Sequence, residues 1–287
     1  MFISNKWQDY EIIDSGEGEK LERWGDIIVI RPDPQIIWPK MKPQAWHNCH
    51  MHYHRSKSGG GSWQHIKKTP KNWTISYAGL TFNIRPTDFK HMGLFPEQAT
   101  NWQWAMDLLK TRPGARVLNL FGYTGGATVC CLKAGANLCH VDAAKGMNQW
   151  AKENIKSSGL ENHPCRIITD DVHKFVQREK RRGSFYDGII LDPPSYGRGP
   201  SGEVWKLENL LYELLQNCTE ILTDSPLFIL LNTYTTGFTA TAAENVLRLV
   251  LRKKGLNVDK IQSGVLGLPI GDSGLVLPCG SSVRANW

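Results

Sequence analysis

The sequence has 287 residues and contains no stretch of about 18 consecutive apolar residues, so we expect no membrane-spanning helix. Its first residues are acidic at Asp9, Glu11 and Asp14 and lack the basic and then apolar pattern of a secretory signal. The seven cysteines are an odd number without paired spacing. This pattern indicates reduced thiols in a cytoplasmic protein rather than a disulfide framework.

The charge balance is mildly basic, with a formal net charge of +7. This charge permits an anionic partner such as RNA without demonstrating one. The length suits one large or two modest domains. Because several prolines break the first third and regular helix and strand patterns follow it, we predict a small β-rich domain over 1–88 and a larger α/β domain over 89–287.

Four short strands are expected in the first third, at 10–14, 26–30, 73–76 and 80–84. Between them, His50, His52 and His54 would share one face of an extended segment. Imidazole is a zinc ligand, but no matching ligand pair recurs downstream at metal-site spacing. A polar loop or an edge strand is the alternative, and we predict no metal.

The segment from Arg55 to Lys71 combines basic residues with glycines and with the aromatic residues Trp63 and Trp73. The basic residues are Arg55, Lys57, Lys67, Lys68 and Lys71, and the glycines are Gly59, Gly60 and Gly61. Basic side chains neutralise phosphates, and aromatic rings stack on bases. The segment is either an RNA-binding element or a solvated loop with a core tryptophan at each end.

The most informative stretch is Arg116 to Gly126, read together with Asp142. Residues 117–120 form a buried strand pattern, and the glycines that follow allow a sharp turn and close approach to a ligand. A short helix and a second strand then end at Asp142, which is placed to accept hydrogen bonds from a ribose. The spacing of Gly122, Gly125 and Gly126 does not fit the dinucleotide fingerprint, although a dinucleotide site and a structural turn remain alternatives.

Acidic residues also follow the next two strand patterns. Asp171 comes after 165–169 and either accepts from an adenine amino group or caps the helix that begins at Val172. Asp192 follows 186–191, and the two prolines after it force the chain out of the sheet. This rigid loop is placed to hold a planar amine or ring, with Tyr196 as a stacking wall.

A helix is expected to begin near Pro96, since proline suits the first turn. Its start would face the ligand, so Gln98 and the backbone near Phe95 are candidate contacts. Five strands alternating with helices, followed by a terminal hairpin, are the architecture of class I methyltransferases.

The motifs that carry a resemblance are 119–125, 141–145, 192–199 and 89–98. With them, residues 89–287 resemble S-adenosylmethionine-dependent methyltransferases related to the bacterial 23S rRNA large-subunit enzymes. The N-terminal segment around 14–22 resembles the small β domain of the same subgroup, and we recognise no RNA-binding PUA domain ahead of it. The resemblance implies a Rossmann-like, seven-stranded mixed sheet and S-adenosylmethionine as the cofactor.

We therefore predict a cytoplasmic enzyme that methylates a nucleic-acid base in RNA, with ribosomal RNA as the first candidate and no DNA or membrane partner. The expected cofactor-binding residues are Phe95, Gln98, Asn119, Phe121, Gly122, Tyr123, Thr124, Gly125, Asp142, Ala143, Asp171, Val172 and Asp192. The expected catalytic residues are Asp192, Pro193, Tyr196 and Asn232. The alternatives are a protein or small-molecule acceptor, or a catalytically silent RNA-binding protein.

The cysteine positions indicate how the methyl group would be transferred. Methylation of carbon 5 of a pyrimidine needs a Cys thiolate that first adds to carbon 6. In the family members that do this, the Cys lies where this sequence has Asn232 to Tyr234, and no Cys stands there. Cys130, Cys131 and Cys218 fall in apolar helix patterns, which leaves Cys279 as the remaining candidate. Because we do not expect a nucleophile in a terminal hairpin, we predict direct transfer to a nitrogen or oxygen.

Overall fold

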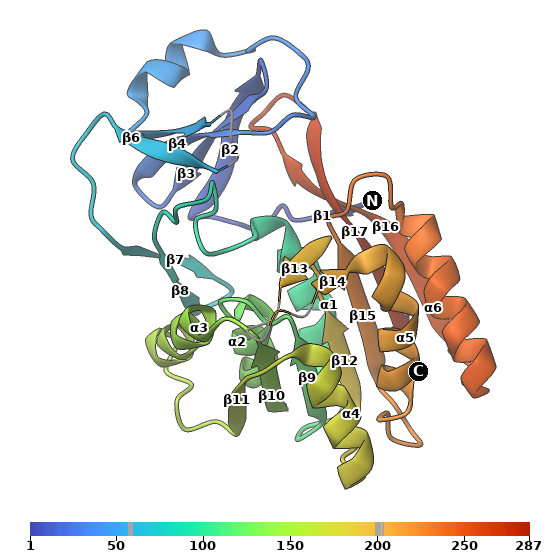
Figure 1. Ribbon diagram of the computed structural model, residues 1–287. Coiled ribbons are helices and arrows are strands. Elements are labelled where there is room, and N and C mark those ends of the chain that lie inside the picture. The colour runs from blue at the N-terminus through green and yellow to red at the C-terminus, as the bar shows by residue number, and fades with distance from the viewer. Residues whose placement is uncertain (57–59, 199–201, 203) are drawn as a thin grey trace. The chain divides into compact units, whose positions relative to one another are not determined.

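The computed structural model describes residues 1–56, 60–198, 202 and 204–287 (Figure 1). These residues form two compact units. The large unit comprises Met1–Phe2, Gln98–Leu266 and Cys279–Trp287, and the small unit comprises Ile3–Glu97 and Gly267–Pro278. In the first half of the chain, the division between the two units falls between Glu97 and Gln98. The domain boundary predicted after residue 88 stays a prediction.

The large unit is built on a mixed sheet whose strands are ordered β1-β16-β17-β15-β12-β9-β10-β11. The strands are β1 (Phe2–Ile3), β9 (Arg116–Leu120), β10 (Asn137–Asp142), β11 (Cys165–Thr169), β12 (Gly188–Leu191), β15 (Phe228–Thr233), β16 (Lys260–Pro269) and β17 (Val276–Asn286). From β11 to β15 all pairs are parallel, and β17 pairs antiparallel with β15. The predicted class I methyltransferase sheet of seven strands is confirmed, and the two-residue β1 joins its edge.

Six helices of the described chain connect these strands. They are α1 (Ala99–Leu109), α2 (Gly126–Lys133), α3 (Lys145–Ser157), α4 (Val172–Arg182), α5 (Leu207–Thr219) and α6 (Ala240–Lys254). The helix α2 packs on α1 and α3, and α5 packs on α4 and α6. The strand order runs outward from β9 to β11 and then returns to β12, so right-handed crossovers place the two helix groups on opposite faces of the sheet (Figure 1).

The parallel strands end at one level, and this register creates the ligand edge. Leu120 pairs with Val141 and with Leu191, and Leu191 pairs with Leu231. Leu120, Leu191 and Leu231 are fully buried in the core between sheet and helices. The polar residues that follow these strands are therefore held at a common edge by the apolar residues before them.

A short antiparallel hairpin interrupts the segment between β12 and α5. It pairs β13 (Tyr196–Arg198) with β14 (Val204–Lys206). The sequence predicts a rigid ligand-holding loop here but no strand pairing, because two prolines force the chain out of the sheet. Gly199 and Pro200, the end of that expected loop, lie outside the described residues.

The small unit contains a five-stranded sheet in the order β2-β3-β4-β5-β6 and a separate hairpin of β7 and β8. The strands are β2 (Tyr10–Gly16), β3 (Glu19–Trp24), β4 (Ile27–Pro32), β5 (Met51–Arg55), β6 (Gly61–His65), β7 (Trp73–Tyr77) and β8 (Leu80–Ile84). Two 3₁₀ helices, η1 (Pro43–Asn48) and η2 (Pro96–Gln98), complete the elements. A parallel bridge from Ile12 to Ile270 ties 267–278 to this unit.

The strand β3 was missed because its sequence is largely charged. Glu22 on this strand is fully buried, where it accepts from Arg31 Nη2 at 2.7 Å and from the Tyr10 hydroxyl at 2.7 Å. Burial alone would raise the pKa of Glu22, but the charges of Arg31 and Lys20 lower it to about 2. Because Glu22 is buried as part of an ion pair, the sequence of this core strand has the polar pattern of a surface segment.

The histidine-rich segment forms β5 in the interior of the sheet, between β4 and β6. The rings of His52 and His54 lie 4.0 Å apart, whereas Nδ1 of His50 accepts from the backbone of Ile28. No three His, Cys, Asp or Glu side chains of the described residues are grouped to hold a metal ion. The prediction that no metal binds stays a prediction.

The basic segment is more ordered than the expected loop, because it contains the end of β5 and all of β6. Lys67 donates from Nζ to the Asn48 carbonyl oxygen at 3.0 Å, and Lys68 and Lys71 are exposed. Lys57 and Gly59 lie outside the described residues.

Candidate active site at the carboxyl edge of the sheet

The turn after β9 has a strained backbone. Phe121 and Tyr123 have φ values of +55° and +51°, and Gly125, which precedes α2, has +81°. A non-glycine residue in this region costs about 1–3 kcal/mol, and such residues cluster at functional sites. Two aromatic residues with left-handed backbone in one short turn make it a candidate ligand-binding element.

A buried histidine lies directly beneath this turn. A Cβ atom added to Gly122 would lie 2.5 Å from Nδ1 and 2.8 Å from Nε2 of His140, so only glycine fits. His140 is fully buried, its Nδ1 lies 2.8 Å from the Thr128 hydroxyl, and Asn119 donates to the same hydroxyl at 2.9 Å. Burial lowers the pKa of His140 to about 4, so the ring is neutral at pH 7.

Asp142 ties the second strand to the same turn. Its Oδ2 accepts from the backbone N–H of Tyr123 at 2.9 Å, and its Oδ1 accepts from that of Ala144 at 2.8 Å. Burial raises the pKa of this carboxyl, and the two backbone hydrogen bonds act against that shift. Each oxygen has a second lone pair, so the carboxylate keeps acceptor capacity for hydroxyl groups. The neighbouring Ala143 is exposed.

The helix α3 holds the other end of the turn. Thr124 is buried, and its carbonyl oxygen accepts from Asn154 Nδ2 at 2.8 Å. A Cβ atom on Gly125 would lie 2.9 Å from the Cβ of Ala151, so the glycine also permits this close packing. The turn is thereby fixed from below and from the side.

After β11, the two acidic residues have separate structural partners. Asp171 caps α4, because its Oδ1 accepts from the backbone N–H of Lys174 at 2.9 Å. Asp170 forms an ion pair with Arg178 and accepts from the backbone of Asp171. Val172 is buried at the start of the helix. The capping alternative is confirmed, while the contacts of Asp171 and Val172 to an adenine stay predictions.

The proline loop after β12 is anchored on both sides. Ser195 Oγ lies 2.7 Å from Thr235 Oγ1, in the segment that follows β15. Asp192 is partly buried and Pro193 is buried, whereas Tyr196 is 51% exposed on β13. The stacking of the Tyr196 ring on a flat acceptor stays a prediction.

Trp205 of β14 connects the hairpin with the turn after β9. Its Nε1 donates to the Pro194 carbonyl oxygen at 2.5 Å. Its ring lies 5.3 Å from that of Phe121 and 5.5 Å from that of His173. Trp205 is not recognisable as a site residue from the sequence, because nothing in its local pattern reveals partners in three other segments.

The segment after β15 joins a buried polar network. Asn101 Nδ2 donates at 2.8 Å to both Asn232 Oδ1 and Gln98 Oε1, and Gln98 Nε2 donates at 2.8 Å to the Tyr234 hydroxyl. The Tyr234 ring packs on Gly280, where an added Cβ atom would lie 2.7 Å from it. Gln98 and Asn232 are thus brought together, whereas Phe95 belongs to the small unit, where its ring lies 5.3 Å from that of His91.

Arg284 of β17 fixes the orientation of this network. It is 7% exposed, and its Nε donates to Asn101 Oδ1 at 2.8 Å and its Nη2 to Thr100 Oγ1 at 3.1 Å. Burial lowers its pKa to about 10, and its guanidinium also lies over the ring of Phe2. Because Arg284 occupies the oxygen of Asn101, the amide nitrogen of Asn101 must point to Gln98 and Asn232.

None of the described cysteines forms a disulfide bond, and those in the helices are core residues as predicted. Cys130, Cys131 and Cys218 are at most 1% exposed, and burial raises the pKa of each thiol. Cys279 lies on β17 and is partly buried.

Over the described part of the chain, no helix has the length and apolar character needed to cross a membrane.

Comparison with known proteins identifies relatives of this fold and edge. Residues 37–252 match a family model described as S-adenosylmethionine-dependent methyltransferase. The crystal structure of a SAM-dependent methyltransferase from Agrobacterium tumefaciens is 38% identical with a TM-score of 0.94, covering 99% of this chain and 92% of that chain. A tRNA methyltransferase of M. jannaschii shares the fold at 13% identity and a TM-score of 0.56, covering 96% of this chain and 74% of that chain.

Ribosomal RNA large subunit methyltransferase I of Photobacterium profundum is 31% identical over 136 residues, which are 47% of this chain. The matched part is 34% of that enzyme, so the chain spans about a third of its length.

Proposed function

This chain belongs to the S-adenosylmethionine-dependent methyltransferase family, and we propose that it transfers the methyl group of this cofactor to a nucleobase of RNA. The observation that carries the proposal is the common edge at which β9, β10, β12 and β15 end. A strained turn, a carboxylate and a rigid proline loop meet there, which is where open α/β sheets bind their ligands.

The chain offers groups that fit the cofactor at this edge. Asp142 would accept the ribose hydroxyls through its remaining lone pairs. The predicted turn residues Asn119, Phe121, Gly122, Tyr123, Thr124 and Gly125 would line the adjoining part, with Gln98 and Ala143 beside them. Asp171, Val172 and Phe95 remain further proposed contacts. When bound, the sulfonium supplies an already activated methyl group, so the protein mainly aligns an acceptor and excludes water.

The acceptor would be held by the segments after β12 and β15. Asp192 and the Pro193 carbonyl would accept hydrogen bonds from an acceptor nitrogen, which orients its lone pair. Tyr196 would stack on the plane of the base. Because Oδ1 of Asn232 already accepts from Asn101, its amide nitrogen is the part left to donate to an acceptor atom of the substrate.

We propose direct transfer to nitrogen or oxygen, without a covalent cysteine intermediate. The buried thiols with raised pKa values support this, because only a thiolate would attack a pyrimidine ring. Seven cysteines that form no disulfide bond among the described residues also suit a reducing compartment, so we propose a cytoplasmic location.

RNA is the favoured substrate for two reasons, and we propose ribosomal RNA first. Relatives over part of the chain are ribosomal RNA methyltransferases, and the chain is basic with a lysine-rich segment at 67–71. A protein or small-molecule acceptor uses the same cofactor edge and is the alternative.

The deciding experiment follows the label from methyl-labelled cofactor into total RNA, protein and metabolite fractions. We expect incorporation into RNA, and loss of it in Asp192→Ala. Asp224→Asn, an exposed carboxyl variant, is the matched control. Label in the protein or metabolite fraction would select the alternative acceptor. RNA binding without any label transfer would indicate a silent RNA-binding protein.

A further inference from the structure

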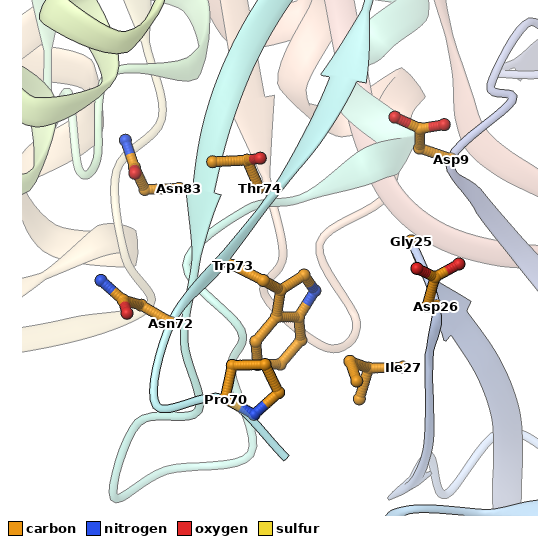
Figure 2. Close-up of a pocket in the computed structure, with 9 residues that line it drawn as sticks. All are labelled: Asp9, Gly25, Asp26, Ile27, Pro70, Asn72, Trp73, Thr74 and Asn83. Carbon is orange, nitrogen blue, oxygen red and sulfur yellow. The ribbon is translucent and has the colours of Figure 1, made fainter.

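A cavity of about 530 Å³ lies in the small unit, and none of the expected cofactor-binding or catalytic residues lines it (Figure 2). Its volume is within the range of small-ligand sites. The residues that line it are Asp9, Gly25, Asp26, Ile27, Pro70, Asn72, Trp73, Thr74 and Asn83. In Figure 2 the Trp73 ring lies between Pro70 and Asn72 on one side and Asp26 and Ile27 on the other.

Hydrogen bonds hold the walls of this cavity in place. Trp73 Nε1 donates to the Trp24 carbonyl oxygen at 2.9 Å, which fixes the indole ring. Asp9 Oδ2 accepts from the backbone N–H of Ser76 at 2.8 Å, and its carbonyl oxygen accepts from Gly25 at 2.7 Å. The register of β7 and β8 pairs Thr74 with Asn83, so both residues lie side by side on the hairpin.

The lining combines one aromatic ring with amides and carboxylates. Unpaired RNA bases are recognised by stacking on such rings and by hydrogen bonds to their edges. The amides of Asn72 and Asn83 contain both donors and acceptors, whereas Asp9 and Asp26 only accept when ionised. Acceptor-only groups favour a base with an exocyclic amine and disfavour a phosphate inside the cavity.

Lysine residues are close in sequence to the residues that line the cavity. Lys71 lies between the lining residues Pro70 and Asn72, and both Lys68 and Lys71 are exposed. Basic residues outside a negatively charged pocket suit a nucleotide strand whose phosphates stay outside while one base enters.

We propose that this pocket binds one unpaired, amine-bearing nucleobase of the RNA substrate, at a site separate from the reacting base. The proposal rests on RNA as the proposed substrate. Trp73 stacks on the base, Asp26 accepts from its exocyclic amine, and Lys68 and Lys71 hold the flanking phosphates.

The test compares the binding of fluorescent oligo(C) and oligo(U) RNA to the full chain at pH 7.5, because cytosine carries an exocyclic amine and uracil does not. We expect the wild type to prefer oligo(C), and Asp26→Asn to reduce that preference about tenfold, as expected for one specific base contact. Asp224→Asn removes the same charge at an exposed position and should leave the preference unchanged.

A second variant examines stacking. Trp73→Ala should weaken binding of both oligomers about tenfold, in line with the loss of one stacked base. If Trp73→Ala fails to fold, the result for Asp26→Asn still decides, because Asp26 is exposed. Equal affinities of the wild type for the two oligomers, or an unchanged preference in Asp26→Asn, would overturn the proposal.

The label-transfer assay runs in parallel on the same proteins. RNA labelling together with an unchanged preference in Asp26→Asn would reject the pocket and leave the proposed function intact. Label in the protein fraction would reject the RNA methyltransferase, and the binding comparison would still decide separately whether the pocket binds a base.

Discussion

Replacement of Gly122 by alanine tests the close contact between the strained turn and the buried histidine. The new Cβ atom would lie 2.5 Å from Nδ1 and 2.8 Å from Nε2 of His140, and real Cβ atoms essentially never approach so closely. His140 is fully buried and bonded to Thr128, so it has little room to move. Something in the turn or beneath it must therefore shift.

The expected destabilisation follows from two contributions. Overpacking of a core costs about 1–3 kcal/mol. A broken hydrogen bond between His140 and Thr128 adds about 1 kcal/mol. We expect Gly122→Ala to lower the free energy of unfolding by about 2–4 kcal/mol, and to weaken binding of S-adenosylmethionine because the turn is displaced.

The assay is urea unfolding followed by circular dichroism, combined with calorimetry of cofactor binding. The control is the same substitution in a His140→Ala background. There the clash partner is gone, so the coupling between the two changes should recover most of the loss. An equal loss in both backgrounds, or no loss in either, would refute the reasoning.

Three further predictions concern the ribose acid, the basic segment and the pH dependence. Asp142→Ala should weaken cofactor binding by about 1–3 kcal/mol, since the ribose hydroxyls of the bound cofactor would lose their hydrogen-bond acceptor. An unchanged affinity, measured by calorimetry in a folded variant, would contradict this. Replacing Lys67, Lys68 and Lys71 should flatten the salt dependence of RNA binding by roughly one unit of log–log slope per lost phosphate contact, and a wild-type slope would leave the segment as a solvated surface. Burial lowers the pKa of His140 from 6.5 to about 4, so its contribution to stability is present above pH 6.5 and is lost as the pH falls towards 4. His140→Gln should remove up to about 3 kcal/mol of that pH dependence in urea titrations, and identical profiles of the two proteins would exclude it.

Most elements of the large unit could be predicted, and their bounds differ by a few residues. The strand at 165–169 was predicted to the residue, because a short strand pattern ends at two acids there. The strand β3 was not predicted, since its buried Glu22 looks like a surface residue until Arg31 is placed beside it. The hairpin β13–β14 was not predicted, because glycines and prolines hide its short pairing.

The residues of the candidate site likewise fall into those that the sequence predicts and those that it does not. Its turn and acids were visible in the sequence, because each stands directly after a strand pattern. Trp205, Asn101, Arg284 and His140 were not singled out, since their partners are remote in the chain. Arg284, for example, bonds to Asn101, which is 183 residues away.

The sequence by itself determined the family, the order of most strands and helices of the large unit, and the carboxyl edge where the cofactor turn and the acids gather. It could do so because strand ends and glycine turns are local patterns, and parallel strands must bring their carboxyl ends together. Only the tertiary structure decided which side chains orient Asn232, why Gly122 must be glycine, and where the small unit forms a lined cavity. Those features depend on contacts between residues far apart in the chain, and no local pattern records them.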